Sequence, residues 1–404
     1  MKKKILVILP YFPYPLNSGG NIAIFEMINY LRYNHSITIL ALNSSVSNVS
    51  ELKQKWENVD IRTYSNESFI QLLIKRISKV FLYIYLFCLS LIVERKNYAN
   101  TYLTTTLNPY LNPNLIKLLK DIQLETVFDF IQVEFYELLP LIHYINTTSQ
   151  TIFIHHELRF VRYQRACEMN QFNKLMLSLI KGQEIEFLKQ YNRVVTVSDF
   201  DRQILENDLN SSNLSTSTLT IRIQEKKIVQ AYKFNRILTF LGGSEHYPNK
   251  DGILWFLENC WNELIEQSDF KLNIIGNWSK NDIKLLKKYK NVHFLGFVEN
   301  LEHSLKNTIM IVPIRIGSGM RMKIIEAANY GIPFITTSVG VEGLDFIHNH
   351  DCIIADGAEA FIQEIIELSN NTILQNTLIQ NAYNTIETKY NSNTLFNKRN
   401  QLYT

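Results

Sequence analysis

The chain has 404 residues, which is too many for one small hydrophobic core, so we expect two domains. Its 41 Lys and Arg residues against 38 Asp and Glu residues give a formal net charge of +3, and this near balance offers no argument for a nucleic-acid partner. The four cysteines are far apart and lack C-x-x-C spacing, which favours a reduced cytoplasmic protein over a disulfide or zinc framework.

The chain begins with MKKKILVILPYFPYP, a short apolar run that leads into prolines without a small-residue cleavage site. This start differs from a secretory signal peptide, and the run predicts a buried strand over 3–10. A loop with Gly19 and Gly20 follows, then a helix (NIAIFEMINYLRY) and a strand (SITILAL). This order is typical of a doubly wound α/β sheet. The glycine pair fits phosphate binding and a plain turn equally well.

The most apolar part of the chain is 69–95, and its segment 80–93 holds fourteen residues without a charge. The preferred interpretation is a buried helix. A second is a monotopic helix that dips into an anionic membrane surface, because Lys and Arg residues flank the apolar run. The third is a transmembrane span, although such a span usually needs about 20 apolar residues.

Two strands of the first domain end in ionisable side chains. VFDFIQVEF (127–135) carries Glu134 at its carboxyl end, and TIFIHH (151–156) ends in His155 and His156. The carboxyl ends of parallel strands border the ligand crevice of a doubly wound sheet. Because side chains alternate between the faces of a strand, only one histidine can face this crevice. The alternative is a core histidine whose hydrogen bonds are satisfied.

Three arginines, Arg159, Arg162 and Arg165, recur every three residues after the second of these strands. They form either a basic helical stripe for an anionic acceptor or a solvated helix face, and we prefer the solvated face. Further along, RVVTVS (193–198) predicts a strand, and Ser198 is expected to cap the helix that follows it.

The polar and small residues of 207–218 predict a loop at a domain boundary, and LTIRI after them predicts a short strand. From Arg236 onwards, four apolar runs alternate with helical patterns, as in a second doubly wound unit: ILTFLGG, FKLNIIG, NVHFLGFV and TIMIVPI. We therefore expect an α/β protein with two Rossmann-like domains, 1–218 and 219–389, followed by a terminal segment, 390–404.

The most informative stretch is 311–344, IVPIRIGSGMRMKIIEAANYGIPFITTSVGVEGL, which predicts strand, glycine loop, helix, strand and loop. Gly331 stands where the glycine after a helix C-terminus belongs, and Pro333 bars continuation of the helix. A glycine loop that opens a helix after a buried strand offers free N–H groups to an anion. The positive end of the helix dipole adds to this, so the stretch predicts a phosphate site.

Charged residues in the helix refine this prediction. Arg321 and Lys323 add two cations in its first turn, and Glu326 shares a face with Lys323. A carboxylate there can accept hydrogen bonds from two neighbouring sugar hydroxyls. Phosphate charge together with vicinal hydroxyls describes a nucleoside diphosphate. The alternative is that Lys323 and Glu326 form a surface ion pair and that the glycines only turn corners.

The run GSGMRMKIIEAANYGIPFITTSVGVEGL resembles the donor-binding segment of the family 4 retaining glycosyltransferases (glycosyl transferases group 1), which have the GT-B fold. That family usually carries two glutamates, of which the second matches Glu326 and the first falls on Ser318. The sequence therefore resembles the subset in which a GxGxRxKxxEA run replaces this motif. The resemblance implies that Glu326 holds the nucleotide ribose and that Arg321 and Lys323 meet the diphosphate. Ser318 and Gly319 would lie in the donor-binding loop.

The resemblance also covers the first glycine loop of the second domain. Many family members have an Arg after the first glycine there and a Lys five residues later, both on the diphosphate. This chain has Gly243 and Pro248 at those positions, which assigns the phosphate to Arg321 and Lys323. Gly243 is still expected at the donor, and Lys250 is a further candidate cation.

In the first domain, the resemblance places Gly19 and Gly20 near the donor sugar and the acceptor. It also places a histidine contact to the donor sugar at a strand end, for which His156 is chosen and His155 is the reserve. In GT-B proteins the terminal helix usually returns to the first domain, and 390–404 would do so here.

The resemblance implies a retaining, metal-independent glycosyltransferase of the hexosyltransferase type. It would move a sugar from a UDP- or GDP-linked donor to a hydroxyl of a glycan or lipid-linked glycan acceptor, in envelope polysaccharide or glycan assembly. Domain 1–218 would bind the acceptor and 219–389 the donor, with no cofactor and no metal site. The expected location is cytoplasmic, with peripheral contact to the inner face of the cell membrane through 69–95. The alternatives are an inactive GT-B scaffold, because of Ser318, and a nucleotide-sugar epimerase.

Overall fold

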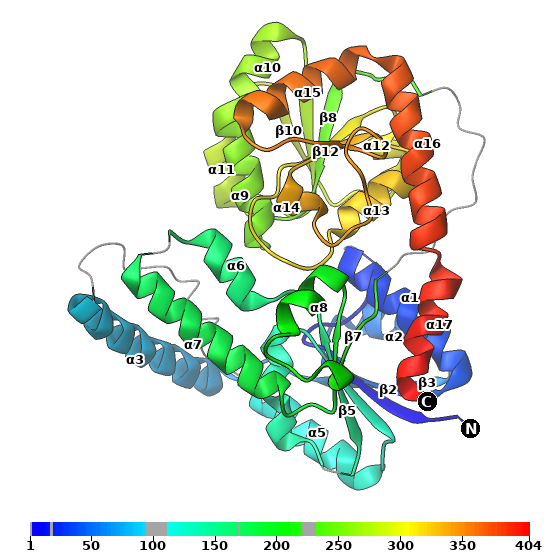
Figure 1. The fold of residues 1–404 in the computed structure, drawn as a ribbon. Coiled ribbons are helices and arrows are strands. Elements are labelled where there is room, and N and C mark those ends of the chain that lie inside the picture. The colour runs from blue at the N-terminus through cyan, green and yellow to red at the C-terminus, as the bar shows by residue number, and fades with distance from the viewer. Residues whose placement is uncertain are drawn as a thin grey trace. The chain divides into compact units, whose positions relative to one another are not determined.

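The structure of this chain is a computed structural model. It describes residues 2–16, 19–93, 111–146, 148–168, 170–219, 223 and 232–404. The chain divides into two compact units, of which one is Met1–Thr218 with Phe396–Thr404 and the other is Leu219–Leu395 (Figure 1). Each unit is built around one parallel sheet, as predicted for a doubly wound α/β protein. The predicted strand LTIRI lies mostly outside the described residues.

Within the described residues, the first unit has a seven-stranded parallel sheet in the order β3-β2-β1-β4-β5-β6-β7. The strands are β1 (Lys4–Ile8), β2 (Ser36–Leu42), β3 (Val59–Tyr64), β4 (Phe130–Glu134), β5 (Gln150–His155), β6 (Arg193–Thr196) and β7 (Leu214–Thr216). The first strand is central, because Ile5 pairs with Ile37 of β2 on one side and with Phe130 of β4 on the other. Residues 5–8 are consequently fully buried, as an apolar run in a parallel sheet should be.

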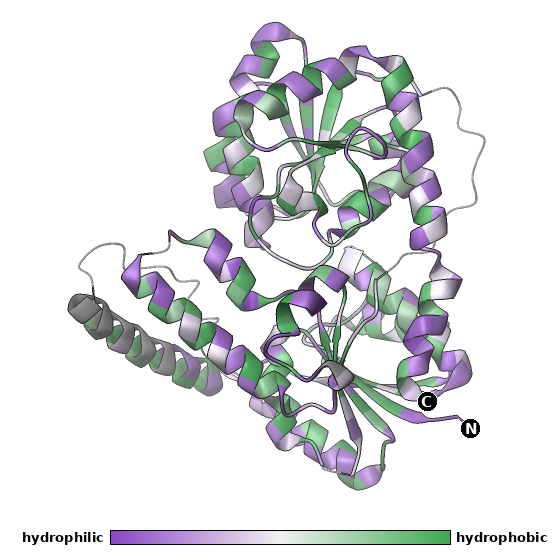
Figure 2. Ribbon diagram, in the orientation of Figure 1, coloured by the Kyte–Doolittle hydropathy of each residue, from purple (hydrophilic) through white to green (hydrophobic). Residues whose placement is uncertain are grey.

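Helices surround this sheet. They are α1 (Gly19–Asn34), α2 (Val46–Lys55), α3 (Phe69–Val93), α5 (Pro113–Glu125), α6 (Arg159–Ala166), α7 (Gln171–Leu188), α8 (Asp199–Leu205) and the 3₁₀ helices η1 (Tyr136–Tyr144) and η2 (Ser211–Asn213). Ser198 caps α8 as predicted, since its hydroxyl accepts the backbone N–H of Asp201 at 3.1 Å. Hydrophobic residues concentrate in the strands, whereas most helices carry polar residues as well (Figure 2).

The edge strand β7 lies inside the stretch 207–218, for which the sequence predicted a loop. Leu214 of this strand is buried, and the hydroxyl of Thr216 donates to Oδ1 of Asp199 at 2.7 Å. The prediction was wrong here because an edge strand needs one neighbour only. Short Ser and Thr side chains are acceptable in such a strand, so it shows no apolar run.

Within the described residues, the second unit has a six-stranded parallel sheet in the order β10-β9-β8-β11-β12-β13. The strands are β8 (Ile237–Leu241), β9 (Lys271–Ile275), β10 (Val292–Gly296), β11 (Ile309–Val312), β12 (Phe334–Thr336) and β13 (Ile353–Ile354). The four apolar runs predicted as strands form β8 to β11, so the second doubly wound unit is confirmed.

The helices of the second half of the chain alternate with these strands and then follow them. They are α9 (Tyr247–Phe256), the π-helix η3 (Leu257–Trp261), α10 (Asn262–Gln267), α11 (Lys280–Leu286), α12 (Leu301–Leu305), α13 (Met322–Asn329), α14 (Ser338–Val341), α15 (Ala358–Asn370), α16 (Thr372–Lys389), α17 (Ser392–Asn400) and the 3₁₀ helix η4 (Gln401–Tyr403). Helix α14 is a single turn inside VGVEGL, where the sequence predicted only a loop.

The end of α13 is formed as the sequence predicted. Gly331 has a φ of 66°, and its N–H donates to the carbonyl of Ala328 at 3.2 Å. The N–H of Ile332 then donates to the carbonyl of Ala327 at 2.9 Å, which satisfies a second free carbonyl of the last turn. A left-handed residue is required at this position, and glycine adopts that conformation without strain.

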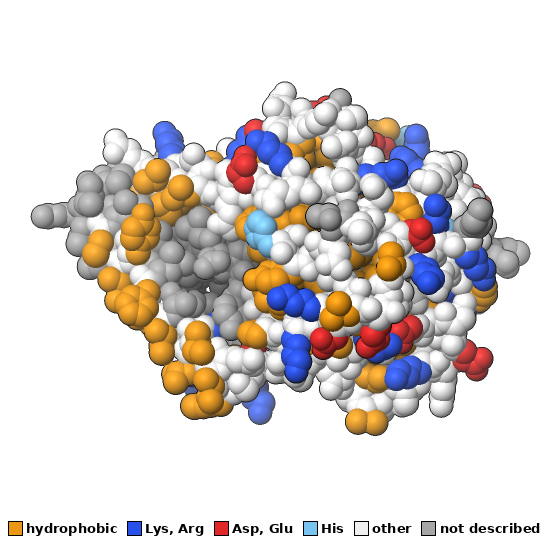
Figure 3. All heavy atoms as spheres, turned by 90° about the horizontal axis from the view of Figure 1, so that it is seen from below, with side chains coloured by type: hydrophobic (Ala, Val, Ile, Leu, Met, Phe, Trp, Pro, Cys, Tyr) orange, Lys and Arg blue, Asp and Glu red, His pale blue; other side chains and the backbone are white. Residues whose placement is uncertain are grey.

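Helix α3 presents apolar side chains to solvent. Phe69, Ile74, Val80, Phe81 and Tyr85 are 55–77% exposed, and Figure 3 shows apolar side chains gathered along this part of the first unit. The preferred prediction of a buried helix is therefore wrong for these side chains. Of the helices that the structure describes, none combines the length and the apolar character needed to cross a membrane.

The segment 396–404 is held by the first unit. Oδ1 of Asn400 lies 2.7 Å from Nε2 of His35, and the guanidinium of Arg193 donates to the carbonyl of Leu402 at 2.6 Å. These contacts attach the segment to two strands of the sheet, since His35 directly precedes β2 and Arg193 is the first residue of β6.

Candidate active site

The loops at the carboxyl ends of the second unit's strands are tied to one another. The N–H of Gly276, after β9, donates to the carbonyl of Gly296 at 2.8 Å. The indole N–H of Trp278 donates to the carbonyl of Gly242, after β8, at 2.8 Å. Because parallel strands end at one edge of a sheet, these loops form a common surface, which is where doubly wound units bind ligands.

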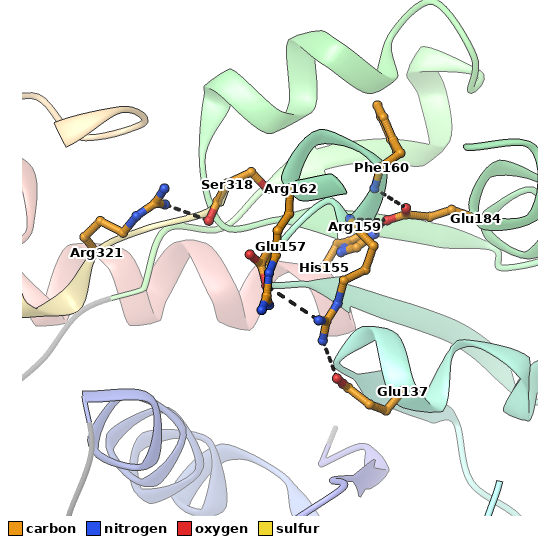
Figure 4. Close-up of polar contacts among 9 residues, drawn as sticks. All are labelled: Glu137, His155, Glu157, Arg159, Phe160, Arg162, Glu184, Ser318 and Arg321. Atoms are coloured by element: carbon orange, nitrogen blue, oxygen red, sulfur yellow. Dashed lines mark hydrogen bonds and ion pairs between the residues drawn. The ribbon is translucent and has the colours of Figure 1, made fainter. Parts of the chain in front are cut away.

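The loop between β11 and α13 carries the predicted phosphate-binding residues. Gly317 and Gly319 have φ angles of 114° and 75°, which other residues rarely adopt. Ser318 between them is buried, and Arg321 occupies the N-cap position of α13. The Arg321 guanidinium donates to the carbonyl of Ser318 at 2.6 Å and to that of Gly319 (Figure 4). In this structure Arg321 therefore fixes the glycine loop.

Lys323 is fixed by contacts that the sequence analysis did not identify. Its ammonium donates to Oδ1 of Asn249 at 2.7 Å and lies 4.4 Å from the centre of the Phe240 ring. Nδ2 of Asn249 donates to the carbonyl of Gly243 at 3.0 Å. The asparagine lies 74 residues from Lys323. The available signal was a polar side chain in the first turn of α9, directly after a glycine loop.

Burial dominates the electrostatics of Lys323 and Glu326. The Lys323 pKa falls to about 7 because burial and nearby Arg321 disfavour its charged form, against the attraction of Glu326. The Glu326 pKa rises to about 7 because the carboxyl is buried, which outweighs the attraction of Lys323. Glu326 is 5% exposed. Because Glu326 is buried and Lys323 is partly buried, the alternative of a surface ion pair is wrong.

Gly243 permits a close approach of two loops. A Cβ atom at this position would lie 2.8 Å from the carbonyl oxygen of Asn277, so a side chain would displace the loop after β9. Glycine therefore fits this backbone, and the cation that the resembled family carries at this position is missing here. Lys250, the further candidate, has its ammonium 2.5 Å from Oδ1 of Asp282.

A hollow of about 430 Å³ opens beside the loops after β9 and β10, and sequence analysis did not identify it. It is lined by Gly276, Asn277, Trp278, Ile283, Phe294, Leu295 and Gly296. The Trp278 and Phe294 rings are 5.7 Å apart at their centres. The sequence offered one signal for this hollow: the aromatic residue Trp278 stands two positions after Gly276, the glycine that follows β9.

In the first unit, the two neighbouring histidines point to different carboxylates. Nε2 of His156 lies 2.7 Å from Oε2 of Glu134, at the end of β4. Nε2 of His155 lies 2.6 Å from Oε1 of Glu184, which is on α7. His155 is 1% exposed, whereas the side chain of His156 is 12% exposed. Of the two, His156 is the one with ring surface open to a ligand.

Glu184 also holds the start of α6. Its two oxygens accept the backbone N–H groups of Arg159 and Phe160, each at 3.1 Å, so a fully buried carboxylate caps this helix (Figure 4). His155 therefore acts in the core of the unit, where it supports that carboxylate. His155 is therefore the core histidine of the two, but its hydrogen bonds are not all satisfied, because its buried Nδ1 atom has no hydrogen-bond partner among the described residues.

Two of the three arginines of α6, Arg159 and Arg162, do not lie on the solvated face that we preferred. Arg162 is 6% exposed and donates to Oε2 of Glu157 at 3.0 Å. Arg159 contacts Glu137 and lies 4.0 Å from Glu157 (Figure 4). The prediction was wrong because acidic residues of the neighbouring loop and of η1 draw these guanidinium groups inward.

Gly19 and Gly20 form the first turn of α1 and are partly buried. Residues 17 and 18 before them lie outside the described residues. No three His, Cys, Asp or Glu side chains among the described residues are grouped so that they could hold a metal ion.

Part of the second unit matches a known protein family. Residues 235–371 match the family described as Glycosyl transferases group 1. A Klebsiella pneumoniae protein described as an uncharacterized 44.6 kDa protein in cps region is 28% identical over 168 residues, which are 39% of this chain and 43% of the relative. The chain thus matches less than half the length of that curated relative.

Solved structures match the whole chain at low identity. TarM aligns with a TM-score of 0.70 and 14% identity, over 100% of this chain and 99% of TarM. An S. aureus TarM variant in complex with fondaparinux, alpha-GlcNAc-glycerol and UDP aligns over both full chains, with a TM-score of 0.66 and 12% identity. Sucrose-phosphate synthase from Thermosynechococcus elongatus aligns with a TM-score of 0.71 and 14% identity, over 100% and 98% of the two chains.

These structures define the class: the chain has the GT-B fold, as the sequence predicted. The residues that match the group 1 glycosyltransferase family, 235–371, include the glycine loops, Asn249, Lys323 and Glu326 described above.

Proposed function

We propose that this protein is a retaining, metal-independent glycosyltransferase that moves a sugar from a nucleoside diphosphate sugar to an acceptor hydroxyl. One observation carries the proposal: the ammonium of Lys323 is oriented by Asn249 at 2.7 Å, beside a glycine loop that opens α13. Cation, loop N–H groups and helix dipole together suit a diphosphate. Glu326, one turn further along α13, suits the ribose hydroxyls.

In the transfer step, the bond between the sugar's anomeric carbon and the diphosphate oxygen breaks, and a bond to the acceptor oxygen forms on the same face. The acceptor's proton passes to the departing diphosphate. Lys323, Arg321 and the loop N–H groups stabilise the charge that develops there, and one such donor is typically worth about 3–4 kcal/mol. His156 supplies a polar contact to the transferred sugar.

A UDP-linked donor is favoured over a GDP-linked one, because a structural neighbour was solved in complex with UDP. The hollow lined by Trp278 and Phe294 offers an aromatic surface for a nucleobase. Gly19, Gly20, Ser318 and Gly319 complete the proposed contacts to the donor.

The acceptor is a glycan or lipid-linked glycan in envelope polysaccharide assembly, because the curated relative lies in a cps region. The exposed apolar side of α3 supports a peripheral location on the inner face of the cell membrane, where lipid-linked glycans are assembled. The protein itself stays cytoplasmic in this proposal, with unit Met1–Thr218 binding the acceptor and Leu219–Leu395 the donor.

Calorimetric titration with UDP, GDP, ADP and CMP, each with and without a chelator, tests the donor site. We expect UDP to bind with a Kd unaffected by chelator, and Glu326→Ala to weaken it about 10- to 100-fold through loss of charged hydrogen bonds. Glu367→Ala, at an exposed position of α15, is the control. Binding that requires a divalent ion, or no binding at all, would contradict the proposal.

Product analysis tests the reaction. A retained anomeric configuration, seen by NMR of the transferred sugar, supports the mechanism, and an inverted one contradicts it. Conversion of the donor without acceptor would identify an epimerase. Nucleotide binding without turnover, across a panel of glycan acceptors, would identify a scaffold.

A further inference from the structure

A chain of buried hydrogen bonds leads from segment 396–404 to His156. The hydroxyl of Tyr403 donates to Oε1 of Gln132, and Nε2 of Gln132 donates to Oε1 of Glu134 at 2.5 Å. Oε2 of Glu134 then lies 2.7 Å from Nε2 of His156. Tyr403, Gln132 and Glu134 are each 1% exposed or less, so water does not compete for these bonds.

The chemistry of these groups gives the chain a direction. The amide of Gln132 has one accepting oxygen and one donating nitrogen, so receiving the Tyr403 hydroxyl at its oxygen leaves its N–H₂ for Glu134. That fills one oxygen of the Glu134 carboxylate. The other oxygen is an acceptor, and Nε2 of His156 must therefore carry a hydrogen. Nδ1 is then the ring nitrogen that remains for a ligand.

The plane of the His156 ring is fixed as well. Its centre lies 3.9 Å from that of Phe135, and the two rings are only 5° from parallel. Phe135 has a φ of 71°, a conformation that costs a bulky residue energy and that places its ring over the histidine. The stacked ring of Phe135 and the carboxylate of Glu134 together allow the His156 ring only one orientation.

The position of Tyr403, the first residue in this series of hydrogen bonds, is fixed by its neighbours. Its ring meets those of Phe130 and His35 edge-on, at 5.6 and 5.5 Å between centres. The neighbouring carbonyl of Leu402 accepts from Arg193 at 2.6 Å. Tyr403 therefore belongs to the core beneath β4, and its hydroxyl has a fixed direction.

We propose that Tyr403 and Gln132 are positioning residues, which act through Glu134 to hold His156 in the Nε2–H tautomer with Nδ1 presented to the substrate. Segment 396–404 thus contributes to the site of the first unit and is more than packing. This inference rests on the proposed function for the role of His156, but the hydrogen-bonded chain can be tested without it.

The first readout is the tautomer itself. Nitrogen-15 NMR of the imidazoles distinguishes the two tautomers of a histidine, and His156→Asn identifies the resonances among the nine histidines of the chain. In the wild type we expect Nε2 to be the protonated nitrogen. Tyr403→Phe and, one link further along, Gln132→Met should mix the tautomers. Tyr191→Phe is the matched control, because Tyr191 is a buried tyrosine of the same unit whose hydroxyl donates to the backbone carbonyl of Leu139 at 2.8 Å.

The second readout is kinetic. Loss of one hydrogen bond from the chain should lower kcat by about three- to tenfold with little change in KM for the donor. In a variant that already carries His156→Ala, adding Tyr403→Phe should not lower kcat any further. If Tyr403→Phe matches Tyr191→Phe in both the imidazole spectrum and kcat, the inference is wrong. A wild type that transfers no sugar would instead overturn the proposed function. The imidazole spectrum would still show whether the hydrogen bonds from Tyr403 to His156 fix the tautomer.

Discussion

The Nζ atom of Lys323 donates to Oδ1 of Asn249 across 2.7 Å and so ties α13 to α9. The same amide donates its Nδ2–H to the carbonyl of Gly243 at 3.0 Å. One asparagine thus joins the ammonium group of Lys323 to the glycine loop after β8. Since the ring of Phe240 lies on another side of the ammonium, its direction is set by the fold.

Replacing this asparagine should weaken diphosphate binding. We expect Asn249→Ala to raise the Kd for UDP about 5- to 10-fold, because the ammonium loses the hydrogen bond that aims it. Titration calorimetry measures the change. Asn259→Ala is the control, as Asn259 is exposed and bonds the carbonyl of Trp255 within its own helix. Equal affinities in both variants would refute the positioning role of Asn249.

The affinity for UDP should fall as the pH rises above 7. Burial and Arg321 lower the Lys323 pKa to about 7 in the free protein, so the ammonium loses its proton through this range. A bound diphosphate favours the charged form, and binding at pH 8 should therefore take up a proton. The uptake appears as a dependence of the binding enthalpy on the ionisation enthalpy of the buffer.

Lys323→Met provides the control for this pH effect. The variant should bind UDP weakly, with an affinity that is flat between pH 7 and 8 apart from the changes due to the phosphate group and to Glu326, whose own pKa is about 7. A wild type that shows the same flat profile would argue against Lys323 as the cation that meets the diphosphate.

Sequence analysis predicted those parts of the fold that depend on local chemistry. Gly331 and Pro333 mark the end of α13 by backbone conformation alone, and apolar runs mark the central strands. Glu134 and His156 were identified because the ends of parallel strands share one edge of a sheet. These rules need no knowledge of distant partners.

The rest depends on which distant residues meet. Lys323 meets Asn249 across 74 positions, and Tyr403 meets Gln132 across 271 positions, and no pattern near either residue specifies its partner. The exposure of α3 was missed for a related reason. An apolar helix has the same composition in a core and on a surface that other molecules cover, so its sequence does not distinguish the two.

Removing the charges of Lys323, which is partly buried, and Glu326, which is buried, should stabilise the second unit. The folded pKa of Lys323, about 7, lies below its ordinary value of 10.5, so its burial costs stability as the pH falls below 10.5. The folded pKa of Glu326, about 7, lies above its ordinary value of 4.5, so its burial costs stability as the pH rises above 4.5. Both penalties are present near pH 7.

We therefore expect Lys323→Met/Glu326→Gln to abolish UDP binding and yet to raise the unfolding free energy by up to about 4 kcal/mol at pH 7. Urea unfolding followed by tryptophan fluorescence suits this measurement, because Trp255, Trp261 and Trp278 lie in the second unit. Lys250→Met/Asp282→Asn, which removes a partly exposed ion pair, should change stability by at most about 1 kcal/mol in the opposite direction. A double variant less stable than the wild type would contradict the expectation.

The exposed apolar side of α3 should bind membranes that carry anionic lipids. Phe81 and Ile84 are 68% and 50% exposed, and Arg76 lies on the same helix, so insertion of the apolar side would bring a cation to the headgroups. Phe81→Ser/Ile84→Ser should weaken binding to phosphatidylglycerol-containing vesicles at least about tenfold, since each buried apolar side chain contributes about 1.5–3 kcal/mol. Co-sedimentation measures the bound fraction.

Leu124→Ser/Val127→Ser, at two exposed apolar positions of the same unit away from α3, is the matched control and should bind as the wild type does. If both double variants sediment equally, α3 is not the membrane-binding surface; if the wild type stays in the supernatant, α3 does not bind these vesicles and the expectation is wrong.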